Sequence, residues 1–311
     1  MVEEGEAFWR LKGFRIMRLR VVALALAGVL IASNVGLAQN SNVSGLTDAN
    51  MIPFEFSNTI EGYNVSGIWF PNVIPDGYQD LQGPAVFIFK NVQTGSISEV
   101  AENSISLLGE AYWKDKGIVV YEYYEKVPEL TAKLKQAGKI VLTFSEDDRA
   151  KLKNCYKSTD KCLIFGEAVI DFQDTDFDGQ KELIVVHAHA AQRKVNAYIV
   201  HSFEKNDDGS FQIDALYDKG SMEPLNSLDD FSTVNISKKT IEIEGSGGAC
   251  SSTSSIYAKK KDKYDDGFDF IHFTIWEMDD AGKCYKEEYS VERDGAVGHK
   301  MKLISRVIQT N

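Results

Sequence analysis

The sequence has little positive charge for its length. Its 311 residues include 34 Lys and Arg against 46 Asp and Glu, which gives a net charge of −12. Proteins that bind nucleic acids concentrate positive charge, as do proteins that bind anionic membrane surfaces. The composition therefore argues against nucleic acid and membrane partners, and it favours a cation or a basic protein.

The chain also lacks several catalytic and metal-binding signatures. No two of its four cysteines show the C-x2–4-C spacing of zinc sites. No G-x-S-x-G elbow marks a nucleophilic serine, and no segment repeats at a fixed period. These absences favour a binding or structural protein over an enzyme.

Residues 17–38, MRLRVVALALAGVLIASNVGLA, have the pattern of a secretory signal peptide. Arg18 and Arg20 precede about a dozen mostly apolar residues, too few to span a bilayer comfortably, and Gly36 and Ala38 form a small-x-small cleavage site. No cysteine follows for a lipid anchor. We expect cleavage after Ala38 and a periplasmic or secreted protein without membrane contact.

Residues 1–16 precede this pattern and carry three glutamates where the start of a signal peptide is normally basic. We therefore expect translation to begin at Met17. A genuine long leader is the alternative, and either way residues 1–38 are treated as an N-terminal extension and signal peptide.

Four cysteines in an exported chain suggest disulfides, with three possible pairings. Cys155 and Cys162 flank the short polar turn YKSTDK, and Cys250 and Cys284 each lie beside a predicted strand. We predict the bonds Cys155–Cys162 and Cys250–Cys284.

Most of the chain after residue 60 alternates β-branched and aromatic runs with turn residues, which predicts a mostly β protein. Antiparallel meanders, a sandwich or propeller-like sheets all fit, with one or two helices. The helix expected at 128–138 starts with Pro128 and ends at Gly138, whereas 97–112 is ambiguous between helix and strand. NDDGS at 206–210 predicts a hairpin turn.

Charged residues and the cysteine turn interrupt the predicted strands at 146–162, which we interpret as a linker. It would separate an N-terminal β-rich region at 39–145 from a C-terminal β domain at 163–311. One continuous domain is the alternative.

The segment DTDFDGQKE, residues 174–182, has the pattern of a calcium loop. Carboxylates at alternate positions, Asp174, Asp176 and Asp178, can converge on one cation, and Gly179 permits the tight turn. Lys181 would contribute its backbone carbonyl, and Glu182 would close the site. Position 12 is Val185 and not glutamate, so the loop is not an EF-hand. The alternatives are a solvated acidic turn or a catalytic carboxylate cluster.

Asp174, Asp176, Asp178, Gly179, Glu182 and Leu183, followed by an apolar strand, resemble the calcium loop of FG-GAP (integrin-type) repeats. They also resemble exported bacterial proteins that carry a single such loop. The resemblance implies a structural Ca²⁺ held at a hairpin-like connection.

Some of those single-loop proteins are distantly similar to invertebrate-type periplasmic lysozyme inhibitors, which insert a Ser-Gly loop into the lysozyme cleft. The glycine- and serine-rich segment GSGGACSSTSSIY, residues 245–257, predicts a surface loop tethered by Cys250, and its Ser246 and Gly247 are comparable with the inhibitor loop. The resemblance implies a second possible function, inhibition of a basic cell-wall hydrolase.

Other residues allow further alternatives. His187, His189 and His201 can lie on one face of paired strands and bind Zn²⁺ or Cu²⁺, which would suit a metal-dependent hydrolase. Tyr121, Tyr123 and Tyr124 can form a platform for a carbohydrate or peptide, although tyrosines at strand spacing more often serve core and cross-strand packing.

Overall fold

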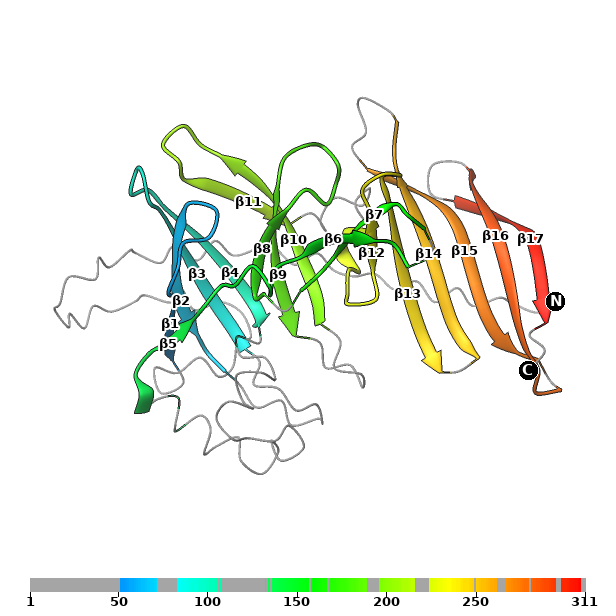
Figure 1. The fold of residues 1–311 in the computed structure, drawn as a ribbon, viewed down its shortest axis with the longest axis horizontal. Helices are drawn as coiled ribbons and strands as arrows, with labels where there is room; N and C mark the ends of the chain where they lie inside the picture. Colours follow the sequence, from blue (N-terminus) through cyan, green and yellow to red (C-terminus); the bar gives the residue numbers. More distant parts are fainter. Residues whose placement is uncertain are drawn as a thin grey trace, which may run out of the picture. The chain divides into compact units, whose positions relative to one another are not determined.

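The computed structural model describes a β protein (Figure 1). The chain divides into two units, Met1–Gly45 and Leu46–Asn311, and every described residue belongs to the second. The described residues are 51–71, 83–105, 107, 132, 134, 136–156, 158–166, 168–188, 196–215, 224–248, 250–261, 267–279, 281–294 and 298–308. The predicted signal peptide, Tyr121, Tyr123, Tyr124 and His189 lie outside them.

The first sheet has nine strands in the order β11-β10-β9-β4-β3-β2-β1-β5, with β8 pairing β9. All of its pairs are antiparallel except β1 with β5, which is parallel. The strands are β1 (Ile52–Phe56), β2 (Tyr63–Trp69), β3 (Gly83–Asn91), β4 (Ile97–Ile105), β5 (Ile140–Leu142), β8 (Ile170–Gln173), β9 (Glu182–Ala188), β10 (Asn196–Lys205) and β11 (Phe211–Ala215).

The second sheet has eight strands in the order β17-β16-β15-β14-β13-β12-β7-β6, and all of its pairs are antiparallel. Its strands are β6 (Lys151–Asn154), β7 (Lys161–Ile164), β12 (Thr233–Asn235), β13 (Thr240–Gly248), β14 (Ser251–Lys259), β15 (Phe268–Met278), β16 (Cys284–Asp294) and β17 (Gly298–Ile308). The mostly β, largely antiparallel fold predicted from the sequence is confirmed.

Alternating burial along the strands produces two hydrophobic cores. In β2, Tyr63, Val65 and Trp69 are buried and pack with aromatic residues of β3 and β8 in the first core. Alternate residues of β9 face opposite ways, so that Leu183 and Val185 lie in the first core while Ile184 and Val186 lie in the second. The second core also contains residues from β12, β13 and β15, and β9 therefore contributes to both cores.

Other local predictions have mixed outcomes. Residues 132, 134, 136 and 137 are helical, inside the segment where a helix was predicted, and the ambiguous segment at 97–112 forms β4 over its first nine residues. The hairpin predicted at 206–210 joins β10 to β11, with Gly209 at φ +80°. Within the described residues, no helix is long and apolar enough to cross a membrane.

Both predicted disulfides are present. Cys155 and Cys162 are bonded with their Cα atoms 5.1 Å apart, and Cys250 and Cys284 are bonded with their Cα atoms 5.5 Å apart. The second bond joins the start of β14 to the start of β16, two strands that flank β15.

The segment 146–162, interpreted as a linker, contains β6 and the start of β7, which pair with each other in the second sheet. The division into 39–145 and 163–311 stays a prediction.

Candidate metal centre

The acidic loop connects β8 to β9, which pair antiparallel in a register that places Gln173 opposite Glu182. The loop therefore connects the two strands of a β-hairpin, and its side chains converge at the start of β9. Asp174, Asp176, Asp178 and Glu182 each offer one carboxylate oxygen, and these four oxygens all lie within 4.8 Å of one another.

Hydrogen bonds from backbone N–H groups to the aspartate carboxylates give the loop its tight turn. The N–H of Asp178 donates to Oδ1 of Asp176 at 3.0 Å, and the N–H of Gly179 donates to Oδ2 of Asp174 at 3.2 Å. Gln180 N–H donates to Oδ1 of Asp178 at 2.6 Å. Gly179 has φ +92°, a backbone conformation that residues other than glycine rarely adopt. Aspartates at alternate positions followed by glycine therefore specify the loop locally.

Phe177, between two of the aspartates, anchors the loop in the second core. Its backbone has φ +65°, which is uncommon for a bulky residue. Its side chain is only 8% exposed, and its ring lies edge-on to Phe268 of β15 with centroids 6.1 Å apart. Burial of this ring offsets the backbone strain. This role of Phe177 was not predicted from the sequence, although an aromatic residue inside an acidic loop is a signal for it.

Glu182 is buried, with 4% exposure, and hydrogen bonds hold one of its oxygens. Oε2 accepts the N–H of Thr175 at 2.6 Å, the hydroxyl of Thr175 at 2.9 Å and the N–H of Asp176 at 3.2 Å. Burial, followed by the charge of Asp176, raises the pKa of Glu182 from 4.5 to about 8. A cation at the cluster would favour the ionised form of this carboxyl.

Asp174 and Asp176 provide further signs of a cation site. Oδ1 of Asp174 is buried without a hydrogen-bond partner among the described residues. Burial also raises the pKa of Asp176, against the opposing charge of Lys259. Buried carboxylates are costly unless a counter-charge is present, and a set of carboxylate oxygens suits hard cations such as Ca²⁺, Mg²⁺ and Mn²⁺. The four acidic residues therefore fit a metal ion.

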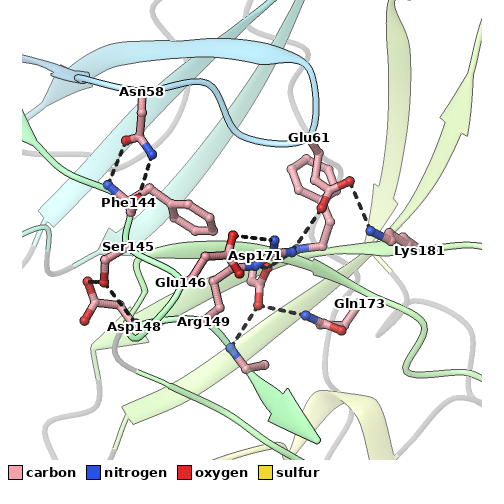
Figure 2. A network of polar contacts seen from close by, with 12 residues as sticks. Asn58, Glu61, Phe144, Ser145, Glu146, Asp148, Arg149, Asp171, Gln173 and Lys181 are labelled. Atoms are coloured by element: carbon pink, nitrogen blue, oxygen red, sulfur yellow. Dashed lines mark hydrogen bonds and ion pairs between the residues drawn. The ribbon is translucent and has the colours of Figure 1, made fainter.

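Lys181 is the remaining predicted ligand, and its side chain belongs to a network of ion pairs. Figure 2 shows Glu61 between Lys181 and Arg149. Nζ of Lys181 lies 3.0 Å from Oε2 of Glu61, and Nη2 of Arg149 lies 3.0 Å from Oε1 of the same carboxylate. Arg149 also pairs with buried Asp171 of β8 at 3.0 Å. The network ties the loop to the β1–β2 turn, and the predicted role of the Lys181 carbonyl stays a prediction.

The described histidines do not support the alternative zinc or copper site. The register pairs His187 with Ala197 and His201 with Leu183, so the two histidines are four residues apart along the strands, roughly 13 Å. Nε2 of His201 contacts Glu102 of β4 in a buried pair. The contact with Glu102 accounts for the buried His201 ring.

The Ser-Gly segment differs from its prediction. Ser246 and Gly247 belong to β13, and residues 245–248 pair with 251–253 of β14 across a register shift between Ser246 and Gly248. A surface loop was predicted because the composition is glycine- and serine-rich. Backbone pairing forms the strand without any need for large side chains.

Comparisons with known proteins give little further information. No family model matches the chain, and no curated protein matches it. A solved structure titled "Structure of a Xanthomonas Type IV Secretion System related protein" aligns with 84% of this chain and 95% of its own length, at 13% identity and a TM-score of 0.42.

Proposed function

We propose that this chain is an exported, non-catalytic binding protein whose β8–β9 loop holds a structural Ca²⁺. The observation that carries the proposal is a set of four carboxylates with oxygens within 4.8 Å of one another, one of which, on Asp174, also has a buried oxygen without a hydrogen-bond partner among the described residues. Asp174, Asp176, Asp178 and Glu182 would hold the ion, with the carbonyl of Lys181 as a fifth ligand. The ion would supply the positive charge that neutralises these buried oxygens.

A structural role fits the surroundings of the cluster better than a catalytic one. Asp176 and Glu182 are 6% and 4% exposed, so a small cation can reach them but a bulky substrate cannot. The loop also carries Phe177 into the second core and leads into β9, which lines both cores. An ion that fixes this loop would therefore stabilise the packing of both sheets.

Export and the choice of partner follow from the disulfides, the N-terminal segment and the net charge. The two disulfides are typical of oxidising compartments, and the signal-like segment at 17–38 points the same way. The net charge of −12 favours a basic protein partner, for which a cell-wall hydrolase is one candidate. Inhibition of lysozyme by micromolar protein would support that candidate, and its absence would remove it.

Calcium should raise the melting temperature of the full chain. A ligand at one hundred times its Kd adds about 2.7 kcal/mol to the stability of a folded state that alone binds it, which corresponds to roughly 4 °C for a chain of this size. The measurement is a pair of thermal melts, one with excess CaCl2 and one with chelator.

The control separates the acidic loop from acidic turns in general. Asp176→Asn/Asp178→Asn should lose the calcium response, whereas Asp207→Asn/Asp208→Asn removes the same charge from the β10–β11 turn and should keep it. An equal response in both double variants would place the ion elsewhere and contradict the proposal.

A further inference from the structure

Lys259, the last residue of β14, lies against the acidic loop. Its Nζ is 3.5 Å from Oδ2 of Asp176, and the two side chains are only 11% and 9% exposed. Burying an ammonium group is costly unless a carboxylate faces it. The pairing of two such buried groups from different sheets is therefore a specific feature of this fold.

The surroundings of Lys259 hold its ammonium at the loop. Nζ lies 5.5 Å from the centroid of the Phe268 ring, which in turn contacts Phe177. The N–H of Lys259 donates to the carbonyl of Lys239 at 2.9 Å, and Nζ of Lys239 reaches the carbonyl of Phe177 at 3.4 Å. Lys259 at the end of β14 and Lys239 next to the start of β13 thus both contact the loop from the second sheet.

We propose that Lys259 is a built-in counter-ion of the acidic cluster that opposes metal binding and sets the affinity of the site. This inference rests on the proposed calcium site. In the metal-free chain, the ammonium offsets part of the repulsion among the four carboxylates. When a divalent cation enters, the same ammonium repels it, because Lys259 is held close to Asp176 and both side chains are almost buried.

The two roles open to Lys259 differ in whether the affinity for Ca²⁺ rises or falls when its charge is removed. Removing the charge in Lys259→Met should tighten Ca²⁺ binding by about tenfold or more, since charge repulsion at an almost buried site is weakly screened. If Lys259 served only to position the loop, the same substitution would weaken binding. The two roles therefore predict opposite shifts of Kd.

The experiment is a calorimetric titration of CaCl2 into the full chain at constant pH and ionic strength, for the wild type and three variants. Lys259→Arg keeps the charge and should bind within about threefold of the wild type. Lys238→Met removes an exposed lysine of the β12–β13 turn that pairs with Asp160, so it controls for net charge and should leave Kd unchanged. Thermal melts in chelator accompany each titration, and Lys259→Met should melt lower than the wild type there but not in excess calcium.

The outcomes are distinguishable. Tighter binding by Lys259→Met alone supports the proposal, including the case in which binding becomes measurable only in that variant. Unchanged or weaker binding overturns the role of Lys259 while the wild-type titration still supports the calcium site. Absence of binding in every protein overturns the calcium site and this inference together.

Discussion

Metal-free protein should become less stable as the pH rises from 4.5 to about 8, and Glu182→Gln should remove most of this loss. In the folded chain, burial and then the charge of Asp176 raise the pKa of Glu182 from 4.5 to about 8. Between these values the folded chain keeps a proton that the unfolded chain releases, so stability falls as pH rises. At about 1.36 kcal/mol for each unit of pKa, the full loss is on the order of a few kcal/mol.

The Glu182→Gln variant isolates this contribution. Its side-chain amide would be neutral at every pH, and the amide oxygen could still accept the bonds from Thr175 and Asp176. The free energy of unfolding in chelator should be measured at pH 5, 6.5 and 8 for the wild type, Glu182→Gln and the exposed control Glu204→Gln. A wild-type stability that is constant or rises across this range relative to Glu182→Gln would contradict the account.

Calcium should reverse the trend in the wild type. The ion binds the ionised carboxylate, so the apparent affinity should increase with pH and level off only above about 8, the pH at which Glu182 is half ionised in the metal-free fold. Glu182→Gln should lose the calcium response because an amide oxygen is a weaker ligand for a hard cation than a carboxylate.

Asp171→Ala should destabilise the protein by about 3–5 kcal/mol, because it breaks a buried ion pair by removing one partner. Asp171 has 4% exposure and accepts from two backbone N–H groups and two side chains. Oδ1 accepts Nε of Arg149 at 3.1 Å and the N–H of Phe172 at 2.8 Å, while Oδ2 accepts the N–H of Ala150 and Nε2 of Gln173, both at 3.0 Å. Alanine would leave these donors unpaired.

A matched control lies in the same network (Figure 2). Glu146 also contacts Arg149, at 3.4 Å, but its side chain is 85% exposed, so Glu146→Ala should cost less than about 1 kcal/mol. Both changes can be measured by urea denaturation of the full chain. A loss at Asp171 no larger than that at Glu146 would show that the Arg149 network contributes little to stability.

The network also affects the acidic loop through Glu61. Partial burial raises the pKa of Glu61, but bonds from Lys181 and Arg149 outweigh burial and hold it below 4.5. Glu61 is therefore an ionised link between the loop and the turn before β2.

The sequence alone predicted the features that depend on residues close to one another along the chain. Asp174, Asp176, Asp178 and Gly179 lie within six positions, and their local backbone bonds gather the carboxylates as the spacing predicts. Runs of β-branched and aromatic residues similarly predicted strands, as in β3 and β9, and the Cys155–Cys162 bond closes a short turn.

Features that depend on strand pairing could not be predicted from the sequence. Lys259 reaches Asp176 only because β14 and the loop pack in the same core. Arg149 reaches Glu61 only because β5, which precedes Arg149, pairs with β1, which precedes Glu61. Residues 245–248 were interpreted as a loop because strand propensity measures side-chain packing, whereas β13 is completed there by backbone bonds to β14. Strand propensity alone does not indicate that another strand will supply such backbone bonds.

The most direct test of the calcium site is the number of ions that each chain binds. Equilibrium dialysis of the full chain against radioactive Ca²⁺ should show one saturable site per chain, and Asp176→Asn/Asp178→Asn should abolish it while Asp207→Asn/Asp208→Asn retains it. Absence of saturable binding up to millimolar Ca²⁺, the range of weak extracellular calcium sites, or binding that survives in the loop variant, would contradict the assignment of these carboxylates as a metal site.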